Sequence, residues 1–197
     1  VMCRQFFPKL GLDPLLLRTK NMMPLGYVDG PTTITCHSTG LAECIAKGEE
    51  HLDYSKKRLA YANQDGPIRR GVGMAIFCYK TGVYPISLET SAVRMVLNQD
   101  GSMQVQVGAT EIGQGADTMW VMMTAETVGV TLDKVYLVSK QDTDVTPYDT
   151  GAYGSRQTYV SGMAVKKTAE SMRRKILEYA ALMTNKDPMD LDIVANK

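Results

Sequence analysis

A β-hairpin signal within residues 92–107 constrains the fold of this chain more than any other feature of its sequence. Asp100-Gly101 is a dipeptide that favours a tight turn between two antiparallel strands. Residues 92–97 before it are mostly apolar, and residues 103–107 after it alternate strictly between apolar side chains and glutamine. Because successive side chains of a strand point to opposite faces, the pattern predicts a sheet with one buried and one hydrated face.

Two further runs of strand length extend the predicted sheet. Residues 72–79 form one apolar run, and residues 135–138 form another. Two helices are expected between and after these strands. One follows Gly115, and the other spans about 155–183 with apolar side chains at spacings of three or four. The sequence therefore predicts an α+β fold, in which an antiparallel sheet of at least three strands has helices packed on it.

The N-terminal third of the chain is expected to be helical. Asp13, which is followed by proline, is typical of the start of a helix. Residues 41–61 resemble a solvated surface helix that is broken near Gly48. We therefore expect a helical linker segment over residues 1–66 and an α+β domain over residues 67–197.

Composition and charge exclude several classes of protein. The chain has 22 basic and 21 acidic side chains, so it lacks the basic excess of a dedicated nucleic-acid binder. No apolar run approaches the roughly 18 residues needed to cross a membrane. The four cysteines include no Cys-x-x-Cys pair and there are two histidines, so no metal-ligand cluster is expected. Free thiols of this kind are typical of a reducing compartment, and we expect a cytoplasmic protein.

The first of two glycine-rich loops, residues 108–118, leaves a strand and enters a helix. A helix N-terminus offers unpaired N–H groups and the positive end of a dipole, so this loop could hold an anion or a polar ring. Gln114 stands between two glycines, and its unshielded amide suits the edge of a heterocycle. The alternative is a tight turn in which Glu111 caps the helix. The residues alone leave both interpretations open.

The second loop, residues 141–156, also lies between a strand and a helix. Gly151 and Gly154 bracket its turn, and Ser155 is a natural N-cap residue. Arg156 places a cation at the start of the helix, where it opposes the dipole unless an anion lies there. Residues that break a local rule in this way tend to be functional. The loop could therefore bind a pyrophosphate.

At these two loops the sequence resembles the molybdenum hydroxylases, the family of xanthine dehydrogenases and aldehyde oxidoreductases. Residues 108–115 resemble the family's Gly-x-Thr-Glu-φ-Gly-Gln-Gly signature, where φ is apolar, and residues 142–147 and 154–157 resemble its bacterial branch. The likeness is greatest to the molybdenum-binding subunits of bacterial xanthine dehydrogenases. Further matches occur in the expected order at residues 10–14, 40–44 and 69–73.

The resemblance implies that the chain is an internal fragment of a larger molybdopterin-binding domain. The expected activity is hydroxylation of an aromatic N-heterocycle, a xanthine-like purine, with water as the oxygen source. The implied cofactor is molybdopterin with molybdenum, in its cytosine dinucleotide form, with iron–sulfur centres and FAD on partner subunits or domains. The family's catalytic glutamate and its Gly-Gly-Phe-Gly stretch have no counterpart here. The isolated chain is therefore expected to be inactive, with no catalytic residue of its own.

The resemblance also implies which residues contact the cofactor. Gln114 would hydrogen-bond the molybdopterin near the metal, and residues 153–156 would contact the pterin and its phosphates. Val83 and Tyr84 fall where the family lines its substrate pocket. The cofactor-binding residues expected in this way are Gly113, Gln114, Gly115, Tyr153, Gly154, Ser155 and Arg156.

Two other classes of function stay open from the residues alone. The glycine-rich loops could be turns of a small scaffold module, or they could serve a stand-alone nucleotide-binding module. A P-loop is absent, and Gly113-Gln114-Gly115 lacks the third glycine of a dinucleotide-binding fingerprint. Neither nucleic acid nor a membrane is an expected partner.

Overall fold

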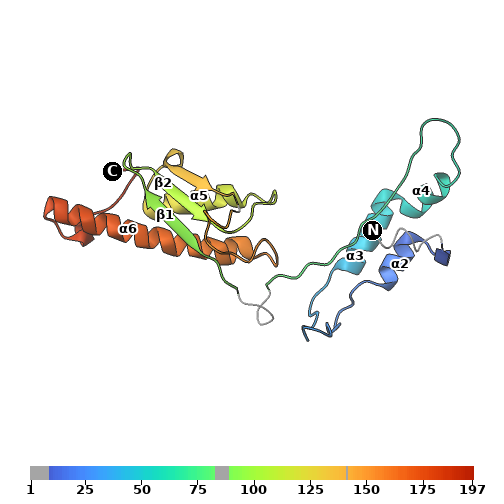
Figure 1. The fold of residues 1–197 in the computed structure, drawn as a ribbon. Helices are drawn as coiled ribbons and strands as arrows, with labels where there is room; N and C mark the ends of the chain where they lie inside the picture. The colour runs from blue at the N-terminus through green and yellow to red at the C-terminus, as the bar shows by residue number, and fades with distance from the viewer. Residues whose placement is uncertain (1–8, 83–88, 141) are drawn as a thin grey trace. The chain divides into compact units, whose positions relative to one another are not determined.

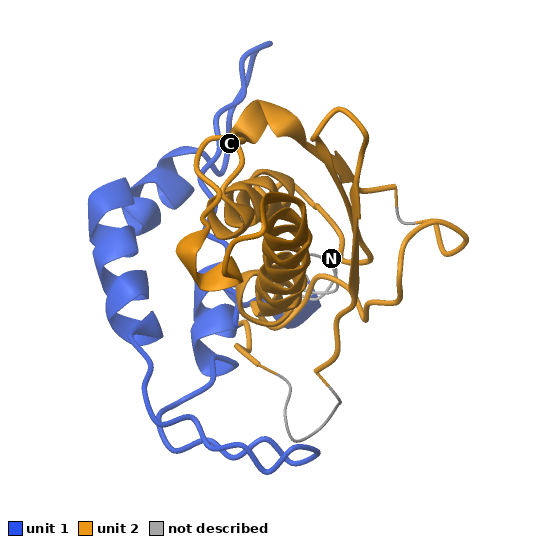
Figure 2. Cartoon of the chain, turned by 90° about the vertical axis from the view of Figure 1, so that its left-hand side faces the viewer, with its two compact units in different colours: residues 1–78 blue, residues 79–197 orange. Residues whose placement is uncertain are grey.

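A computed structural model describes residues 9–82, 89–140 and 142–197 (Figure 1). The chain divides into two compact units, residues 1–78 and 79–197 (Figure 2). The sequence had suggested a division between residues 66 and 67. The structural division comes later because the run 72–78 packs against the helices of the first unit.

The helices of the first unit whose bounds lie within the described residues are α2 (Pro14–Lys20), α3 (Leu41–Leu52) and α4 (Tyr54–Ala60). The predicted start of α2 is confirmed, because the Asp13 carboxylate accepts a hydrogen bond from the Leu15 N–H at 2.7 Å. Leu15 also belongs to the small core of this unit, together with Ile45 and Tyr54.

The expected break near Gly48 is wrong in its position. The chain breaks at Asp53, whose φ of +48° ends α3 and begins α4. Gly48 lies inside α3, where a Cβ would stand 3.1 Å from the terminal methyl of Met74. Gly48 therefore lets the Met74 side chain pack closely against α3, and it does not break the helix.

The run 72–79, predicted as a strand of the sheet, forms no ladder in the structure. Val72, Met74 and Ile76 are half-buried and alternate with exposed residues. This alternation is typical of an extended chain with one apolar face. Here the helices of the first unit cover that face, so the run needs no neighbouring strand.

The second unit contains a three-stranded sheet of β1 (Val93–Leu97), β2 (Met103–Val107) and β3 (Val135–Val138), in that order. The predicted hairpin is confirmed, because β1 and β2 pair antiparallel. The expectation of a wholly antiparallel sheet is wrong, because β3 pairs parallel to β2. A parallel neighbour requires a crossover between the strands, and helix α5 supplies it. The fold is α+β with a mixed sheet.

Two helices pack on one face of this sheet. Helix α5 (Ala116–Val128) ends at Gly129, whose φ of +94° is that of a left-handed C-cap, as predicted. Helix α6 (Gly162–Thr184) continues directly from a π-helical turn, η2 (Gln157–Ser161). Short 3-10 turns span Leu132–Lys134 (η1) and Pro188–Asp190 (η3).

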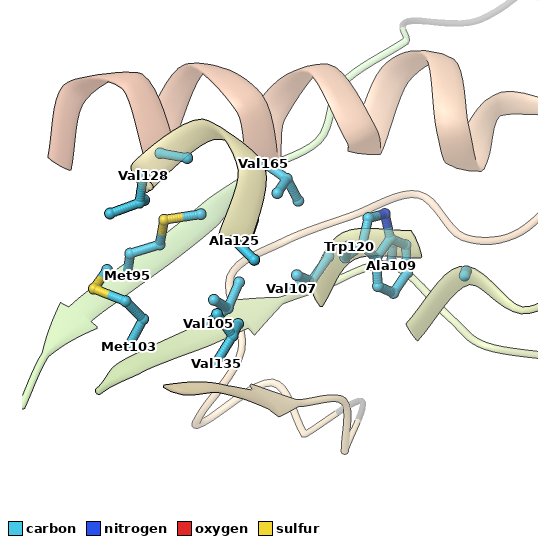
Figure 3. Close-up of a cluster of buried hydrophobic side chains, with 12 residues drawn as sticks. Met95, Met103, Val105, Val107, Ala109, Trp120, Ala125, Val128, Val135 and Val165 are labelled. Atoms are coloured by element: carbon cyan, nitrogen blue, oxygen red, sulfur yellow. The ribbon is translucent and has the colours of Figure 1, made fainter. Parts of the chain in front are cut away.

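The core of the second unit lies between the sheet and these two helices (Figure 3). Met103, Val105 and Val107 of β2 are completely buried, as the alternation predicted. The opposite face is less hydrated than expected, since Gln106 is buried as well. Its amide oxygen accepts a hydrogen bond from the Arg94 guanidinium across the strand pair.

The described helices include none whose length and hydropathy would let it span a bilayer. Within the same residues, no group of three or more His, Cys, Asp or Glu side chains could hold a metal ion.

Candidate cofactor-binding site

The loop between β2 and α5 closes around the carboxylate of Glu111. The N–H groups of Gly113 and Gly115 donate to its Oε1 at 2.6 and 3.1 Å, and the Asp117 N–H donates to its Oε2 at 3.0 Å. These backbone hydrogen bonds, that of Asp117 first, lower the pKa of Glu111. The N-terminus of α5 therefore holds an anion of its own, which confirms the interpretation of Glu111 as a helix-capping acid.

Glu111→Gln is expected to lower the melting temperature near neutral pH and to have a much smaller effect in acid. Because the pKa of Glu111 is lower in the folded protein, its contribution to stability is present above the ordinary glutamate pKa. It is lost as the pH falls through the lowered pKa. Thermal unfolding of both proteins at a series of pH values measures this, with Glu126→Gln at the other end of α5 as control. A difference in melting temperature that does not change with pH would contradict it.

The glycines on either side of Gln114 shape this loop. Gly113 and Gly115 have φ of +99° and +83°, a region that glycine adopts without strain. The Gln114 side chain folds back on the loop, since its Oε1 accepts from the Ile112 N–H and its Nε2 donates to the Thr110 carbonyl. An amide has two N–H donors and two acceptor lone pairs. Half of its hydrogen-bonding capacity therefore remains for a ligand.

In the second loop, the guanidinium of Arg156 is buried and surrounded by acceptors. It donates to Glu89 at 2.9 Å, to Asp149 at 2.5 Å, to the Gly151 carbonyl at 2.8 Å and to the Thr90 carbonyl. Burial alone would lower the pKa of Arg156, but the hydrogen bonds to the two carboxylates raise the pKa overall. The positive charge of Arg156 would oppose the helix dipole, and the carboxylates of Glu89 and Asp149 compensate it.

Ser155 is not the N-cap that the sequence suggested. Its φ of +57° is left-handed, whereas an N-cap residue takes an extended backbone. The N-cap position is occupied by Arg156, and no side chain caps this helix start. Gly154 has φ of +57° as well, as expected for a residue that turns the chain here.

The two loops meet around a cavity of about 380 Å³, which we call the loop pocket. Of the predicted cofactor-binding residues, Gln114, Tyr153, Ser155 and Arg156 line it, whereas the three glycines shape the loops without lining the cavity. The predicted substrate-pocket residues Val83 and Tyr84 lie outside the described residues. The remaining lining residues are Tyr79, Ile112, Ala152, Gln157 and Thr158.

Gln157 is the most informative of the pocket residues that sequence reasoning missed. Its side chain is only 8% exposed, and neither Nε2 nor Oε1 has a hydrogen-bond partner among the described residues. A buried amide without partners costs about 1–3 kcal/mol, so natural folds rarely keep one without a reason. The only available signal was its place directly after Arg156 in the segment 154–157. Its unpartnered amide marks the pocket as a site for a polar ligand.

The profile of one protein family, described as the molybdopterin cofactor-binding domain, matches residues 47–197. The chain belongs to this family. It is 44% identical over 185 residues to a putative xanthine dehydrogenase molybdenum-binding subunit of Escherichia coli, which is 94% of this chain and 25% of that protein. A probable hypoxanthine oxidase of the same species is 31% identical over 170 residues, 86% of this chain and 17% of its own length.

The fold agrees with that of a solved relative. Reconstituted CO dehydrogenase from Oligotropha carboxidovorans superposes with a TM-score of 0.53 at 21% identity, over 96% of this chain and 26% of that one. The predicted membership of the molybdenum hydroxylases is confirmed by these matches. The chain spans about a quarter of the length of the first of these curated relatives.

The residues of the loop pocket are chemically suited to molybdopterin, the cofactor for which the family is named. A pterin ring presents N–H, nitrogen and carbonyl groups along one edge, which are complementary to the amides of Gln114 and Gln157. The uncapped helix start beside Gln157 leaves backbone N–H groups that suit a phosphate. The pocket therefore offers neutral donors and acceptors of the kind that this cofactor needs.

Proposed function

We propose that the loop pocket holds the molybdopterin of a molybdenum hydroxylase, and that the complete protein hydroxylates a xanthine-like aromatic N-heterocycle with water as the oxygen source. The observation that carries the proposal is the buried, unpartnered amide of Gln157 in a cavity that both glycine-rich loops share. The names of the two Escherichia coli relatives, a xanthine dehydrogenase subunit and a hypoxanthine oxidase, support a purine as substrate.

The chain's own residues bind and orient the cofactor in this proposal. Gln157 and the remaining half of the Gln114 amide hydrogen-bond the pterin edge. Tyr153 donates its hydroxyl hydrogen to Thr150 at 2.9 Å, so its oxygen can still accept a hydrogen bond. When bound, the cofactor supplies the molybdenum chemistry of the oxidation.

We also propose that the cofactor is the cytosine dinucleotide form, with its phosphates at the start of η2. Two helix starts border the loops, and Glu111 already occupies that of α5. The start of η2, which continues into α6, has no side-chain cap and is therefore the better place for an anion. Gly113, Gly115 and Gly154 serve this site by adopting the left-handed backbone that shapes the two loops.

The proposal includes partners and a compartment. Electrons would leave through iron–sulfur centres and FAD on partner subunits or domains, and the isolated chain would have no hydroxylase activity. The free thiols of Cys36, Cys44 and Cys78 are consistent with a reducing cytoplasm.

Gln157→Leu, made in the complete protein that contains this chain, tests the proposed site. We expect the retained pterin and molybdenum to fall by about tenfold, since the variant loses hydrogen bonds to a buried ligand. The melting temperature of the cofactor-free form should stay the same or rise, because leucine removes two unpartnered polar atoms from a buried position.

The matched control is Gln104→Leu, which replaces a half-buried glutamine of β2 that does not line the pocket. It should leave the cofactor content unchanged. Full cofactor content in Gln157→Leu, or a large fall in the stability of its cofactor-free form, would show that the amide has a structural role instead.

A further inference from the structure

A buried ion cluster adjoins the loop pocket, because Arg156 belongs to both. The side chains of Arg156 and Asp149 are 1% and 0% exposed, and that of Glu89 is 19% exposed. The three residues come from separate parts of the second unit, with Glu89 lying 67 positions before Arg156. A single guanidinium therefore connects the segment 89–90, the turn 149–151 and the start of η2.

The cluster leaves little of the guanidinium for a ligand. Its hydrogen bonds to Glu89, Asp149 and the carbonyls of Thr90 and Gly151 use four of the five N–H groups that a guanidinium has. Two carboxylates face one cation, so the cluster as a whole presents no excess positive charge to a phosphate. This arrangement differs from that of an arginine held ready for an anion, which keeps a bidentate edge free.

The same cluster fixes the parts of the chain that do face the pocket. Arg156 stands between Ser155, whose backbone is left-handed, and Gln157, whose amide is buried and unpartnered. Its guanidinium carbon also lies 5.5 Å from the centre of the Tyr153 ring, within the range of a cation–π contact. Asp149 in turn accepts from the Ser161 hydroxyl at 3.2 Å, which holds the end of η2.

We infer that Arg156 is a positioning residue, which binds Glu89 and Asp149 so that Ser155, Gln157 and Tyr153 face the loop pocket, and that its guanidinium does not itself bind the cofactor's phosphate. This inference rests on the proposed function for the identity of the ligand. Its structural content, the ordering of residues 154–158 by the ion cluster, can be measured without any ligand.

Removing Glu89's charge separates the two roles, because they predict changes of opposite sign. If the guanidinium bound a phosphate directly, Glu89→Gln would free it from a competing carboxylate and cofactor retention would stay or rise. If Arg156 acts by positioning, the same variant loosens the cluster and cofactor retention falls. Glu89 suits this test because it lies outside the pocket lining and is the most exposed member of the cluster.

The experiment uses the complete protein with Glu89→Gln and Arg156→Lys. We expect Glu89→Gln to lower the retained pterin about threefold or more, and to speed amide hydrogen exchange at residues 154–158 about tenfold in the cofactor-free form. Amides in the middle of α5 should exchange as in the parent. Arg156→Lys should be at least as severe, since one ammonium cannot span the four acceptors that the guanidinium binds.

The control is Arg173→Lys, which alters a second arginine cluster away from the pocket. Arg173 binds the Val128 carbonyl and Asp192, so this variant should lower the melting temperature. It should change neither the retained pterin nor the hydrogen exchange at residues 154–158. Unchanged or higher pterin in Glu89→Gln, or unchanged exchange at residues 154–158, would overturn the inference. A parent protein without pterin would refute the proposed function, and the exchange data would still decide the role of Arg156.

Discussion

Gly108→Ala is expected to destabilise the second unit by about 3 kcal/mol or more and to empty the loop pocket of the proposed cofactor. A Cβ at this position would stand 1.9 Å from the carbonyl oxygen of Pro147 and 3.0 Å from its carbon. Both are backbone atoms, so no rotamer change relieves the clash and the segment 147–149 must move. That segment carries Asp149, the buried partner of Arg156. Urea unfolding and pterin content of the complete protein measure the two effects.

Gly101→Ala separates this clash from ordinary glycine strain. Gly101 has φ of +79°, but nothing lies within 4 Å of the position of its Cβ. The variant should therefore show only the strain of a left-handed alanine, about 1–2 kcal/mol, and should keep its cofactor. Similar losses of stability and cofactor in both variants would mean that the contact between Gly108 and Pro147 does not set the position of the second loop.

Trp120→Ala is expected to cost about 3–5 kcal/mol, a large part of the roughly 5–15 kcal/mol that typically separates a folded domain from its unfolded state. Trp120 is the chain's one tryptophan and is completely buried in the core. Figure 3 shows its ring beside Ala109, between β2 and the helices. Circular dichroism should follow the unfolding, because the variant has no tryptophan fluorescence.

Trp120→Phe provides the matched comparison. The indole Nε1 has no hydrogen-bond partner among the described residues, so phenylalanine loses packing volume and no hydrogen bond. A smaller cost of about 1–2 kcal/mol is therefore expected. Equal costs for alanine and phenylalanine would indicate that the indole N–H makes an essential contact.

The elements predicted correctly from the sequence are those specified by neighbouring residues. Asp100-Gly101 and the alternation in residues 103–107 determine the hairpin, because a tight turn and a two-residue period need no distant contact. Asp13 and Gly129 mark a helix start and a helix end in the same local way. The resemblance of residues 108–115 and 154–157 to one family also led to the loops that meet around the pocket.

The errors on the run 72–78 and on β3 concern segments whose partners are distant in the sequence. Residues 72–78 have a strand's alternation, but the helices of their own unit bury the apolar face before a sheet can. The direction of β3 depends on how α5 crosses from β2, and no residue within β3 encodes it. Ser155 is a common N-cap residue, but the turn before η2 forces it into a left-handed backbone.

By itself, then, the sequence determined the family, the hairpin, the helices of the second unit and the two loops that meet around the pocket, because each is carried by adjacent residues or by a short motif. Only the tertiary structure decided what the charged and amide groups of those loops do. Arg156 has the residue type of a phosphate ligand, yet a carboxylate 67 positions away occupies it. Gln157 looks ordinary in the sequence, yet burial leaves its amide without a hydrogen-bond partner among the described residues, which is the observation that the proposed site rests on.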